Sequence, residues 1–350
     1  MNSVNNKIKV GIIGATGYVG AELARILLSH PYADIAALSS VSFDDTPISD
    51  IYPAFFNILD DKCTGQDEAI EKSDVIFAAL PHGLSQELAE KCINKGKYFI
   101  DMGADFRLKD EIEYRQWYGC EFINQSLHDM AVYGLPELFR KDIIGKKLIA
   151  NPGCYATAVP LSLAPAIANK IIDADTIIID AKSGATGAGK GLAKNTHFPE
   201  LNEGFSPYKV GEHRHTPEIE QTLKIISGEN VSITFVPHLL PINRGIIATC
   251  YAKLNKNISL DEIIALYKEY YKDEIFVRVL NKGQTANLRN VKFSNYCDIS
   301  IHKDEHTNRL ITVGAIDNMV KGAAGQAIQN MNIICGFEET AGLTMAPPSF

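Results

Sequence analysis

One of the seven cysteines stands where a strand should end and a helix should begin. In the segment IANPGCYAT, Pro152 and Gly153 predict a sharp turn, so that Cys154 opens a helix. The N-terminus of a helix stabilises negative charge and lowers the pKa of a thiol placed there. We therefore predict that Cys154 is a nucleophile. The alternative is a packed, unreactive cysteine of the kind common in protein cores.

A nucleophilic thiolate needs a partner that exchanges protons near pH 7, and histidine is suited to this. The segment GEHRHTPEIE offers His213 and His215 ahead of a predicted helix, with Thr216 as N-cap and Pro217 in the first turn. We predict that His215 is the partner and that Glu218 orients it. His213 is the rival, and either histidine could instead be a solvated loop residue.

Glycines at three-residue spacing, in GIIGATGYVG, lie between a predicted strand from Ile8 to Gly14 and a predicted helix from Ala21 to Leu28. Glycine lets backbone N–H groups approach a pyrophosphate, and the helix start adds a positive dipole end. The pattern predicts a dinucleotide site, against the alternative of a plain tight turn. The residues expected to contact the cofactor here are Gly14, Ala15, Thr16, Gly17, Tyr18 and Val19.

The next predicted strand ends at Leu38-Ser39-Ser40-Val41, without the Asp or Glu that usually holds the ribose hydroxyls of NAD. No carboxylate stands there to repel a 2'-phosphate. We therefore predict NADP as the cofactor, with Ser39 and Ser40 in contact with it. The alternative is a short loop without a role.

A second glycine-rich segment, DAKSGATGAGK, follows another predicted strand. Gly187 and Gly189 are predicted to contact the cofactor and Lys182 the substrate, through backbone amides and a cationic side chain. A flexible lid is the alternative. Arg107 and Arg244 are candidates for clamping a carboxylate or phosphate, because a guanidinium group offers a planar, bidentate fork.

Short apolar runs alternate with helical stretches in the first part of the chain, which predicts a doubly wound, Rossmann-like parallel sheet. The runs are 35–38, 75–80, 98–100 and 147–150, and one such helix is 85–94. After Cys154, β-type runs dominate and predict an α+β domain with a mixed, largely antiparallel sheet. These runs are 176–180, 231–236, 245–252, 276–280, 298–302 and 310–314. A final helix, 322–334, is expected to return to the first domain.

This organisation predicts a nucleotide-binding domain at 1–153 and 316–350 and a catalytic and oligomerisation domain at 154–315. The net charge of −8 argues against a nucleic-acid surface. No apolar run reaches the ~20 residues that span a bilayer, and no export signal precedes the first strand, so we expect a cytoplasmic protein. Cysteines without a CxxC pair argue against zinc and against a disulfide framework.

Several segments together resemble the N-acetyl-gamma-glutamyl-phosphate reductase family of the semialdehyde dehydrogenase superfamily, over nearly the full length. They include GIIGATGYVGAEL, GADFRL, ANPGCYATA, DAKSGATGAGKG, THFPELNE, HRHTPEIEQ, FVPHLLPINRG and AIDNMVKGAAGQAIQNMN. Asn151, His197 and Arg214 lie within three of these segments and complete the predicted substrate-binding set. One departure is Val41, where the family often has arginine.

The resemblance implies that NADPH reduces N-acetyl-L-glutamyl 5-phosphate to N-acetyl-L-glutamate 5-semialdehyde through a thioester on Cys154, in arginine biosynthesis. It also implies a homo-oligomer, a dimer or tetramer. Acetylaminoadipyl phosphate and aspartyl phosphate remain alternative substrates. A cysteine hydrolase or acyltransferase, and a regulatory protein with a vestigial site, are the alternatives of other classes.

Overall fold

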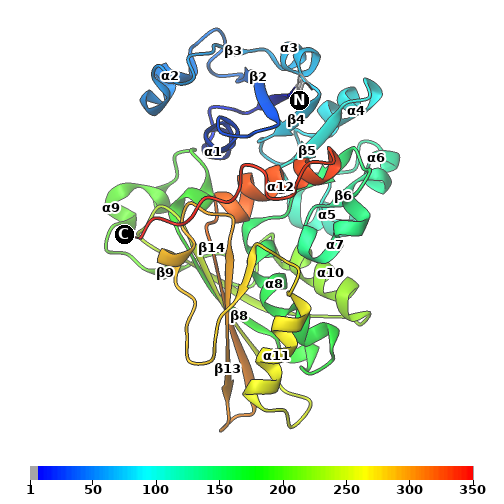
Figure 1. The fold of residues 1–350 in the computed structure, drawn as a ribbon, viewed down its shortest axis with the longest axis vertical. Coiled ribbons are helices and arrows are strands. Elements are labelled where there is room, and N and C mark those ends of the chain that lie inside the picture. The colour runs from blue at the N-terminus through cyan, green and yellow to red at the C-terminus, as the bar shows by residue number, and fades with distance from the viewer. Residues whose placement is uncertain (1–6, 350) are drawn as a thin grey trace, which may run out of the picture. The chain divides into compact units, whose positions relative to one another are not determined.

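The computed structural model describes residues 7–349, which divide into two compact units (Figure 1). The first unit comprises 7–152 and 323–344, and the second comprises 153–322 and 345–349. The sequence predicted that the first domain ends at 153 and that the chain returns to this domain at 316. The observed return at 323 comes later, and the last residues belong to the second unit.

The first unit is built on a seven-stranded sheet in the order β3-β2-β1-β4-β5-β7-β6, with every neighbouring pair parallel. Its strands are β1 (Ile8–Ile13), β2 (Ala33–Ser39), β3 (Cys63–Thr64), β4 (Val75–Ala78), β5 (Tyr98–Asp101), β6 (Val132–Tyr133) and β7 (Leu148–Ala150). The predicted Rossmann-like sheet is confirmed. The two-residue strands β3 and β6 are too short to leave a pattern in the sequence.

Helices connect these parallel strands, as right-handed crossovers require. They are α1 (Tyr18–Leu27), α2 (Ile48–Ile51), α3 (Gln66–Lys72), α4 (Gln86–Asn94), α5 (Glu111–Tyr118), α6 (Gln125–Met130) and α7 (Pro136–Ile143), with the 3-10 turn η1 (Pro53–Phe55). All four residues of β4 are buried, because a central parallel strand is covered on both faces.

The last helix of this unit, α12 (Gly325–Ile334), is buried although it carries several amide side chains. Those of Gln326 and Asn330 both donate to the carbonyl of Gly134, so the NH₂ group of each has an acceptor. The predicted helix began at 322. Instead, a π-helical turn, Val320–Ala324, comes before the α-helix.

The second unit is built on a mixed sheet in the order β12-β13-β14-β11-β8-β10-β9. Its strands are β8 (Ile178–Ser183), β9 (Ser206–Pro207), β10 (Thr234–Leu239), β11 (Ile246–Lys253), β12 (Val277–Val279), β13 (Cys297–Asp304) and β14 (Arg309–Ile316). Four neighbouring pairs are antiparallel, while β8 with β10 and β12 with β13 are parallel. The predicted mixed, largely antiparallel sheet is confirmed.

Two helices of this unit, α8 (Cys154–Ala168) and α11 (Leu260–Tyr270), pack on the sheet, and α10 (Thr216–Ser227) packs on α8 (Figure 1). The shorter elements are α9 (Phe198–Leu201) and the 3-10 turns η2 (Ala174–Thr176), η3 (Ala185–Ala188), η4 (Lys194–Thr196) and η5 (Leu288–Asn290). Burial alternates along β11, so one face of the sheet meets the helices and the other is only half-buried.

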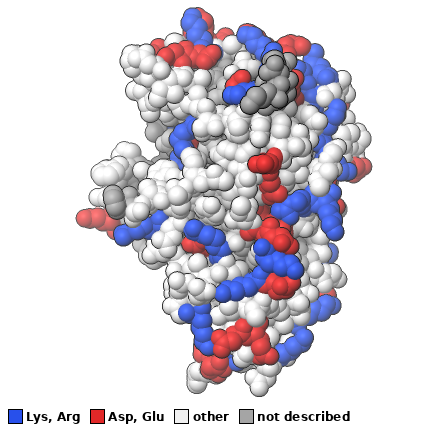
Figure 2. Space-filling model, in the orientation of Figure 1, with Lys and Arg blue, Asp and Glu red and all other residues white. Residues whose placement is uncertain are grey.

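Acidic and basic side chains are interspersed on the face of the molecule drawn in Figure 2, without a broad basic area. Within residues 7–349, no helix is both long enough and apolar enough to cross a membrane. The same residues contain no group of three or more His, Cys, Asp or Glu arranged to hold a metal ion.

A buried carboxylate in the first unit makes stability depend on pH. Asp101 is fully buried, and burial, with the nearby charge of Asp105, raises the pKa of its carboxyl from 3.8 to about 6. The folded state therefore holds this proton more tightly than the unfolded state. The free energy of unfolding should decrease as pH rises from about 4 to about 6.

Urea unfolding across this pH range measures the effect, and Asp101→Asn should remove much of the decrease. Asp60→Asn, at an exposed position, is the control and should keep the wild-type slope. An unchanged slope in Asp101→Asn would contradict the assignment.

Candidate active site

Cys154 is the first residue of α8, directly after Gly153 in extended conformation, as the sequence predicted. Residues 155–167 of this helix are all buried, so the helix is anchored along its length. The N–H groups of its first turn have no carbonyl four residues back to bind. They present partial positive charge at the helix end that carries the thiol.

The other six cysteines lack this setting. Cys63, Cys92, Cys250 and Cys297 are buried, and Cys120 and Cys335 are half-buried but do not begin a helix. Burial raises the pKa of the thiols of Cys92, Cys250 and Cys335 to about 12. These six cysteines therefore fit structural roles better than a nucleophilic one.

A hydrogen bond joins the start of α8 to the first turn of α10. The fully buried carboxylate of Glu218 accepts, through Oε1, the backbone N–H of Gly153 at 2.8 Å. The bond brings the residue before Cys154 to the helix that follows His215. That Glu218 also orients His215 stays a prediction.

His213 is held as a neutral hydrogen-bond acceptor. The backbone N–H of His215 donates to Nδ1 of His213 at 3.1 Å, so this nitrogen carries no proton. Burial, followed by the charge of His215, lowers the pKa of His213 to about 2. His213 therefore remains neutral near pH 7. The geometry favours His215 as the proton carrier.

The predicted cap of α10 was wrong by one residue. His215 occupies the N-cap position, Thr216 is the first helical residue, and no side chain caps the helix. The Thr216 hydroxyl is buried and makes no hydrogen bond within the described residues. His215 is therefore the N-cap residue itself, one position closer to the helix than predicted.

Tyr155 connects the two helix ends through ring contacts. Its ring centroid lies 5.4 Å from that of His213 and 5.9 Å from that of His215. The hydroxyl of Tyr155 lies 3.1 Å from that of Tyr208. Burial, with the hydroxyl of Tyr208 close by, raises the pKa of Tyr155 well above its usual value, so this side chain stays neutral. The sequence analysis did not single out Tyr155.

Gly322, in the π-helical turn, packs directly against the nucleophile. A Cβ added at Gly322 would lie 2.8 Å from Cβ of Cys154 and 3.3 Å from its Cα. The N–H of Gly322 donates to the carbonyl of Asp317, five residues back, which closes the π turn. No local signal in the sequence marks this glycine, because its neighbour is remote in the chain.

The glycine-rich loop after β8 is held by Asn318. This side chain accepts the N–H of Gly245 at 2.7 Å and donates to the Thr186 hydroxyl, which donates to the carbonyl of Asn243. Gly184 is close-packed, since an added Cβ would lie 2.6 Å from the carbonyl oxygen of Asn243. The start of the loop is therefore fixed rather than a free lid.

Gly187 and Gly189 belong to the turn that follows, where Gly189 is exposed with φ of +82°. An added Cβ at Gly189 would meet no atom within 4 Å, so space does not require glycine there, but the positive φ favours it. Contact of either residue with a cofactor stays a prediction.

Lys182 and Ser183, neighbours on β8, lie on opposite faces of the strand. Successive side chains of a strand point to opposite faces, and Ser183 shares the buried face of β8, where its hydroxyl meets Tyr155. Lys182 lies on the other face and forms an ion pair of 2.7 Å with Asp180. Contact of Lys182 with a substrate stays a prediction.

The remaining predicted substrate residues of this unit differ in their settings. Arg244 lies over the ring of Phe293 at 4.7 Å and within 3.6 Å of the buried carboxylate of Asp317. Arg214, which stands between the two histidines in the sequence, is half-buried. His197 is exposed and precedes α9 as its N-cap. Substrate contacts of these three stay predictions.

Arg107 and Asn151, in the first unit, are buried and engaged with protein groups. Arg107 donates to the carbonyls of Asn151 and Met102 at 2.8 and 2.9 Å. The Asn151 amide donates to the carbonyl of Ala323 and accepts from Asn330. Both side chains hold the backbone that leads to Cys154. Contact of either side chain with the substrate stays a prediction.

The turn between β1 and α1 fits a dinucleotide. Gly14 has φ of +83°, and an added Cβ would lie 2.4 Å from the carbonyl oxygen of Ala79. Gly17 precedes α1 as its N-cap, so the N–H groups of Tyr18 and Val19 open the helix. The N–H groups of Gly14 and Ala15 instead donate to the carbonyl of Ser39. These two residues therefore shape the turn and offer no N–H to a phosphate.

The end of β2 limits which side chains can reach a 2'-phosphate. Ser39 is only 1% exposed, whereas Val41 is 83% exposed. The hydroxyl of Ser40 lies 2.9 Å from that of Thr16, and the Tyr52 hydroxyl donates to the carbonyl of Thr16. Ser40 is also buried, at 6% exposed, so of these three residues only Val41 lies at the surface. Contact of Ser39 or Ser40 with a cofactor stays a prediction.

Comparisons with known proteins agree with this division of the chain. The family model "Semialdehyde dehydrogenase, NAD binding domain" matches residues 9–146, and "Semialdehyde dehydrogenase, dimerisation domain" matches 154–318. N-acetyl-gamma-glutamyl-phosphate reductase of Brachyspira hyodysenteriae is 57% identical over 98% of this chain and 100% of its own length. The chain belongs to this reductase family.

Another relative in the N-acetyl-gamma-glutamyl-phosphate reductase family, from Clostridium beijerinckii, is 56% identical over 98% of this chain and all of its own length. Members of this family are oxidoreductases. Among solved structures, aspartate semialdehyde dehydrogenase II of Vibrio cholerae, in complex with ASA, has a TM-score of 0.72 at 15% identity and covers 94% of this chain and 98% of its own. Aspartate semialdehyde dehydrogenase of Candida albicans, with NADP, has a TM-score of 0.72 at 16% identity, covering 93% and 98%. These two show the shared fold.

The place of Cys154 at a helix start, in contact with Gly322, predicts its rate of alkylation. Cys154 should be alkylated by iodoacetamide faster than the other six cysteines near neutral pH, because it begins a helix. Gly322→Ala should slow this alkylation, since the new methyl group displaces the cysteine. Peptide mass spectrometry measures both rates.

Gly65→Ala, where an added Cβ meets nothing within 4 Å, is the control and should leave the rate unchanged. Faster labelling of another cysteine, or a wild-type rate in Gly322→Ala, would contradict this picture.

The histidines give a second prediction. His215→Asn should lower kcat by roughly 100-fold or more, the usual scale for a positioned acid-base group. His213→Asn should lower kcat much less, because His213 is neutral and its acceptor role can pass to the asparagine oxygen. Steady-state kinetics of the two variants decides between them: a larger loss in His213→Asn would assign the proton transfer to His213, and losses of equal size would assign both histidines to holding the loop.

Proposed function

We propose that this protein catalyses the NADPH-dependent reductive dephosphorylation of N-acetyl-L-glutamyl 5-phosphate to N-acetyl-L-glutamate 5-semialdehyde, in arginine biosynthesis. The observation that carries the proposal is the joined pair of helix starts, with Cys154 on α8 and His215 on α10, linked by the bond from Gly153 to Glu218. The names of the full-length relatives support this substrate.

The chemistry begins with proton transfer from the thiol of Cys154 to His215. The thiolate attacks the acyl carbon, the carbon to phosphate-oxygen bond breaks, and a thioester forms. The departing phosphate takes the proton from His215. Arg244 is the candidate to hold an anionic group of the substrate during this step.

Reduction and release follow at the same helix end. NADPH, when bound, supplies a hydride to the thioester carbon. First-turn N–H groups of α8 stabilise the oxyanion that develops there. Collapse of the thiohemiacetal breaks the carbon-sulfur bond, releases the aldehyde and restores the thiolate, and His215 regains a proton from water.

The first unit is proposed to bind NADP at the turn between β1 and α1. The support is the close packing of Gly14 and the helix start at Tyr18 and Val19. The Candida albicans structure was obtained with NADP. Ser40 and the backbone beside it are proposed to meet the 2'-phosphate, since no carboxylate ends β2 to repel it.

We further propose that the protein works as a homo-oligomer, a dimer or tetramer, in the cytoplasm. Support comes from the match of residues 154–318 to a family model described as a dimerisation domain. The half-buried face of the mixed sheet, which carries Ile247 and Tyr251 on β11, offers a surface for a second copy. Light scattering of the purified protein measures its mass in solution.

The direct test of the activity runs in the reverse direction. Reduction of NADP should occur with N-acetylglutamate semialdehyde and phosphate, and much more slowly with aspartate semialdehyde and phosphate. Cys154→Ala should abolish turnover and keep NADPH affinity near that of the wild type, because the cofactor turn lies in the other unit. Substantial turnover by Cys154→Ala would exclude the thioester mechanism.

The exposed position 41 tests the cofactor assignment. Val41→Arg should raise kcat/KM for NADPH about tenfold, the effect of one added charge-assisted hydrogen bond, and leave kcat/KM for NADH nearly unchanged. Ile112→Arg, also at an exposed position of this unit, is the control for added charge. Equal effects of both variants would place the 2'-phosphate elsewhere.

A further inference from the structure

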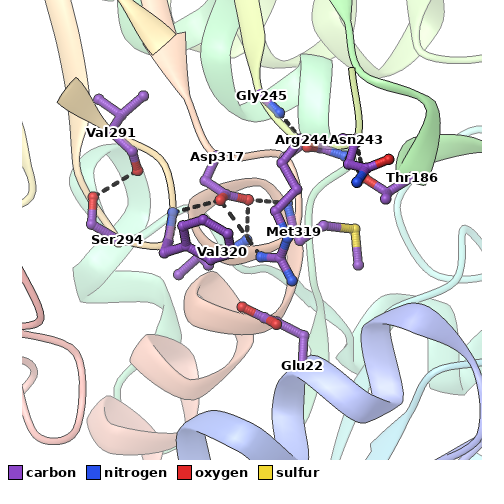
Figure 3. Close-up of polar contacts among 12 residues, drawn as sticks. Glu22, Thr186, Asn243, Arg244, Gly245, Val291, Ser294, Asp317, Met319 and Val320 are labelled. Atoms are coloured by element: carbon purple, nitrogen blue, oxygen red, sulfur yellow. Dashed lines mark hydrogen bonds and ion pairs between the residues drawn. The ribbon is translucent and has the colours of Figure 1, made fainter. Parts of the chain in front are cut away.

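Asp317 is fully buried, and both oxygens of its carboxylate accept hydrogen bonds from backbone N–H groups. It follows β14 directly, and one oxygen, Oδ1, accepts the N–H groups of Met319 at 2.8 Å and Val320 at 3.2 Å. The other oxygen, Oδ2, accepts the N–H of Phe293 at 2.6 Å. Figure 3 shows the carboxylate between these backbone groups and the side chain of Arg244.

The two carboxylate oxygens serve two parts of the candidate site. Through Oδ1, Asp317 holds the start of the π-helical turn whose Gly322 packs against Cys154. Through Oδ2, it lies 3.6 Å from a guanidinium nitrogen of Arg244, and it fixes Phe293, whose ring Arg244 covers at 4.7 Å. A buried carboxylate is retained only when such partners compensate its charge.

We propose that Asp317 is a positioning residue, which aims Arg244 at an anionic group of the substrate and holds the π-helical turn beside Cys154. This inference rests on the proposed function for the identity of the substrate. The carboxylate fixes the direction of a long, flexible side chain. It therefore removes the entropy cost of ordering Arg244 when the substrate binds.

A second pair, of an arginine with a buried aspartate, provides a matched control in the same unit. Arg278 donates to Asp298 at 2.6 Å and covers the ring of Tyr296 at 4.5 Å. Asp298, on β13, is 1% exposed and Asp317, directly after β14, is 0% exposed. Loss of either carboxylate removes a buried ion pair, but only Asp317 is connected to Arg244 and the turn of Gly322.

Asp317→Asn separates the two functions of the carboxylate, which are to hold the π-helical turn and to direct Arg244. Its amide oxygen can still accept from Met319 and Val320, whereas its NH₂ group faces two donors, the Phe293 N–H and Arg244. We expect KM for the acyl phosphate to rise about tenfold or more, with the alkylation rate of Cys154 within about twofold of wild type because the π-helical turn is kept. Asp298→Asn should change KM by less than about twofold.

A double-mutant cycle identifies Arg244 as the residue through which Asp317 acts. In an Arg244→Met background, Asp317→Asn should produce no further rise in KM. Additive effects of the two changes, or a KM in Asp317→Asn no higher than in Asp298→Asn, would overturn the inference. If Asp317→Asn does not fold, Asp317→Glu keeps the charge, displaces it by one methylene group and must show the same order of effects.

A readout independent of turnover separates this inference from the proposed function. Inorganic phosphate and N-acetyl-L-glutamate are each tested for protection of Cys154 against iodoacetamide. The ligand whose protection depends on Asp317 shows whether Arg244 holds a phosphate or a carboxylate. Asp317→Asn should raise the half-protecting concentration of one of them about tenfold. Wild-type protein that is protected but does not turn over the acyl phosphate would refute the proposed function alone. Protection by both ligands that is unchanged in Asp317→Asn would refute the inference.

Discussion

The arrangement of the candidate site depends on the hydrogen bond between the Gly153 N–H and the carboxylate of Glu218. Glu218 is fully buried, and hydrogen bonds to charged groups contribute roughly 1.5–3 kcal/mol. The bond fixes the two helix starts at one place, because α8 cannot shift within its apolar surroundings. The two helix starts in turn place Cys154, at the beginning of α8, and His215, at the beginning of α10.

Burial decides which groups at this place can exchange protons. Tyr155 and His213 both remain neutral near pH 7, since burial raises the pKa of the tyrosine and lowers that of the histidine. Their rings pack on one another and on His215 without competing for its proton. This leaves Cys154 and His215 as the pair proposed to exchange a proton.

The sequence could predict features that depend on neighbours along the chain. The start of α8 at Cys154 follows from a proline and a glycine ahead of a long apolar helix, and the glycine turn follows from its place after β1. The N-cap of α10 was misplaced by one residue, because His213 accepts the N–H of His215 and draws the histidine into the helix end. Such a contact is invisible in residue preferences.

Side-chain direction and remote contacts account for the other differences. Lys182 lies on the half-buried face of β8, where it pairs with Asp180, and the alternation of the strand could have indicated this face. Arg107 and Asn151 bind backbone carbonyls that only the folded chain brings near. Asp317 and Gly322 were missed because their partners, Phe293 and Cys154, are distant in sequence.

The central claim is that the acyl group is carried on Cys154, and a single-turnover experiment without NADPH tests it most directly. Wild-type protein mixed with N-acetyl-L-glutamyl 5-phosphate should release one phosphate per subunit in a rapid burst. Intact-mass spectrometry should show the matching N-acetylglutamyl adduct, located on the peptide that contains Cys154. Release of phosphate without an adduct, or an adduct at another residue, would contradict the account.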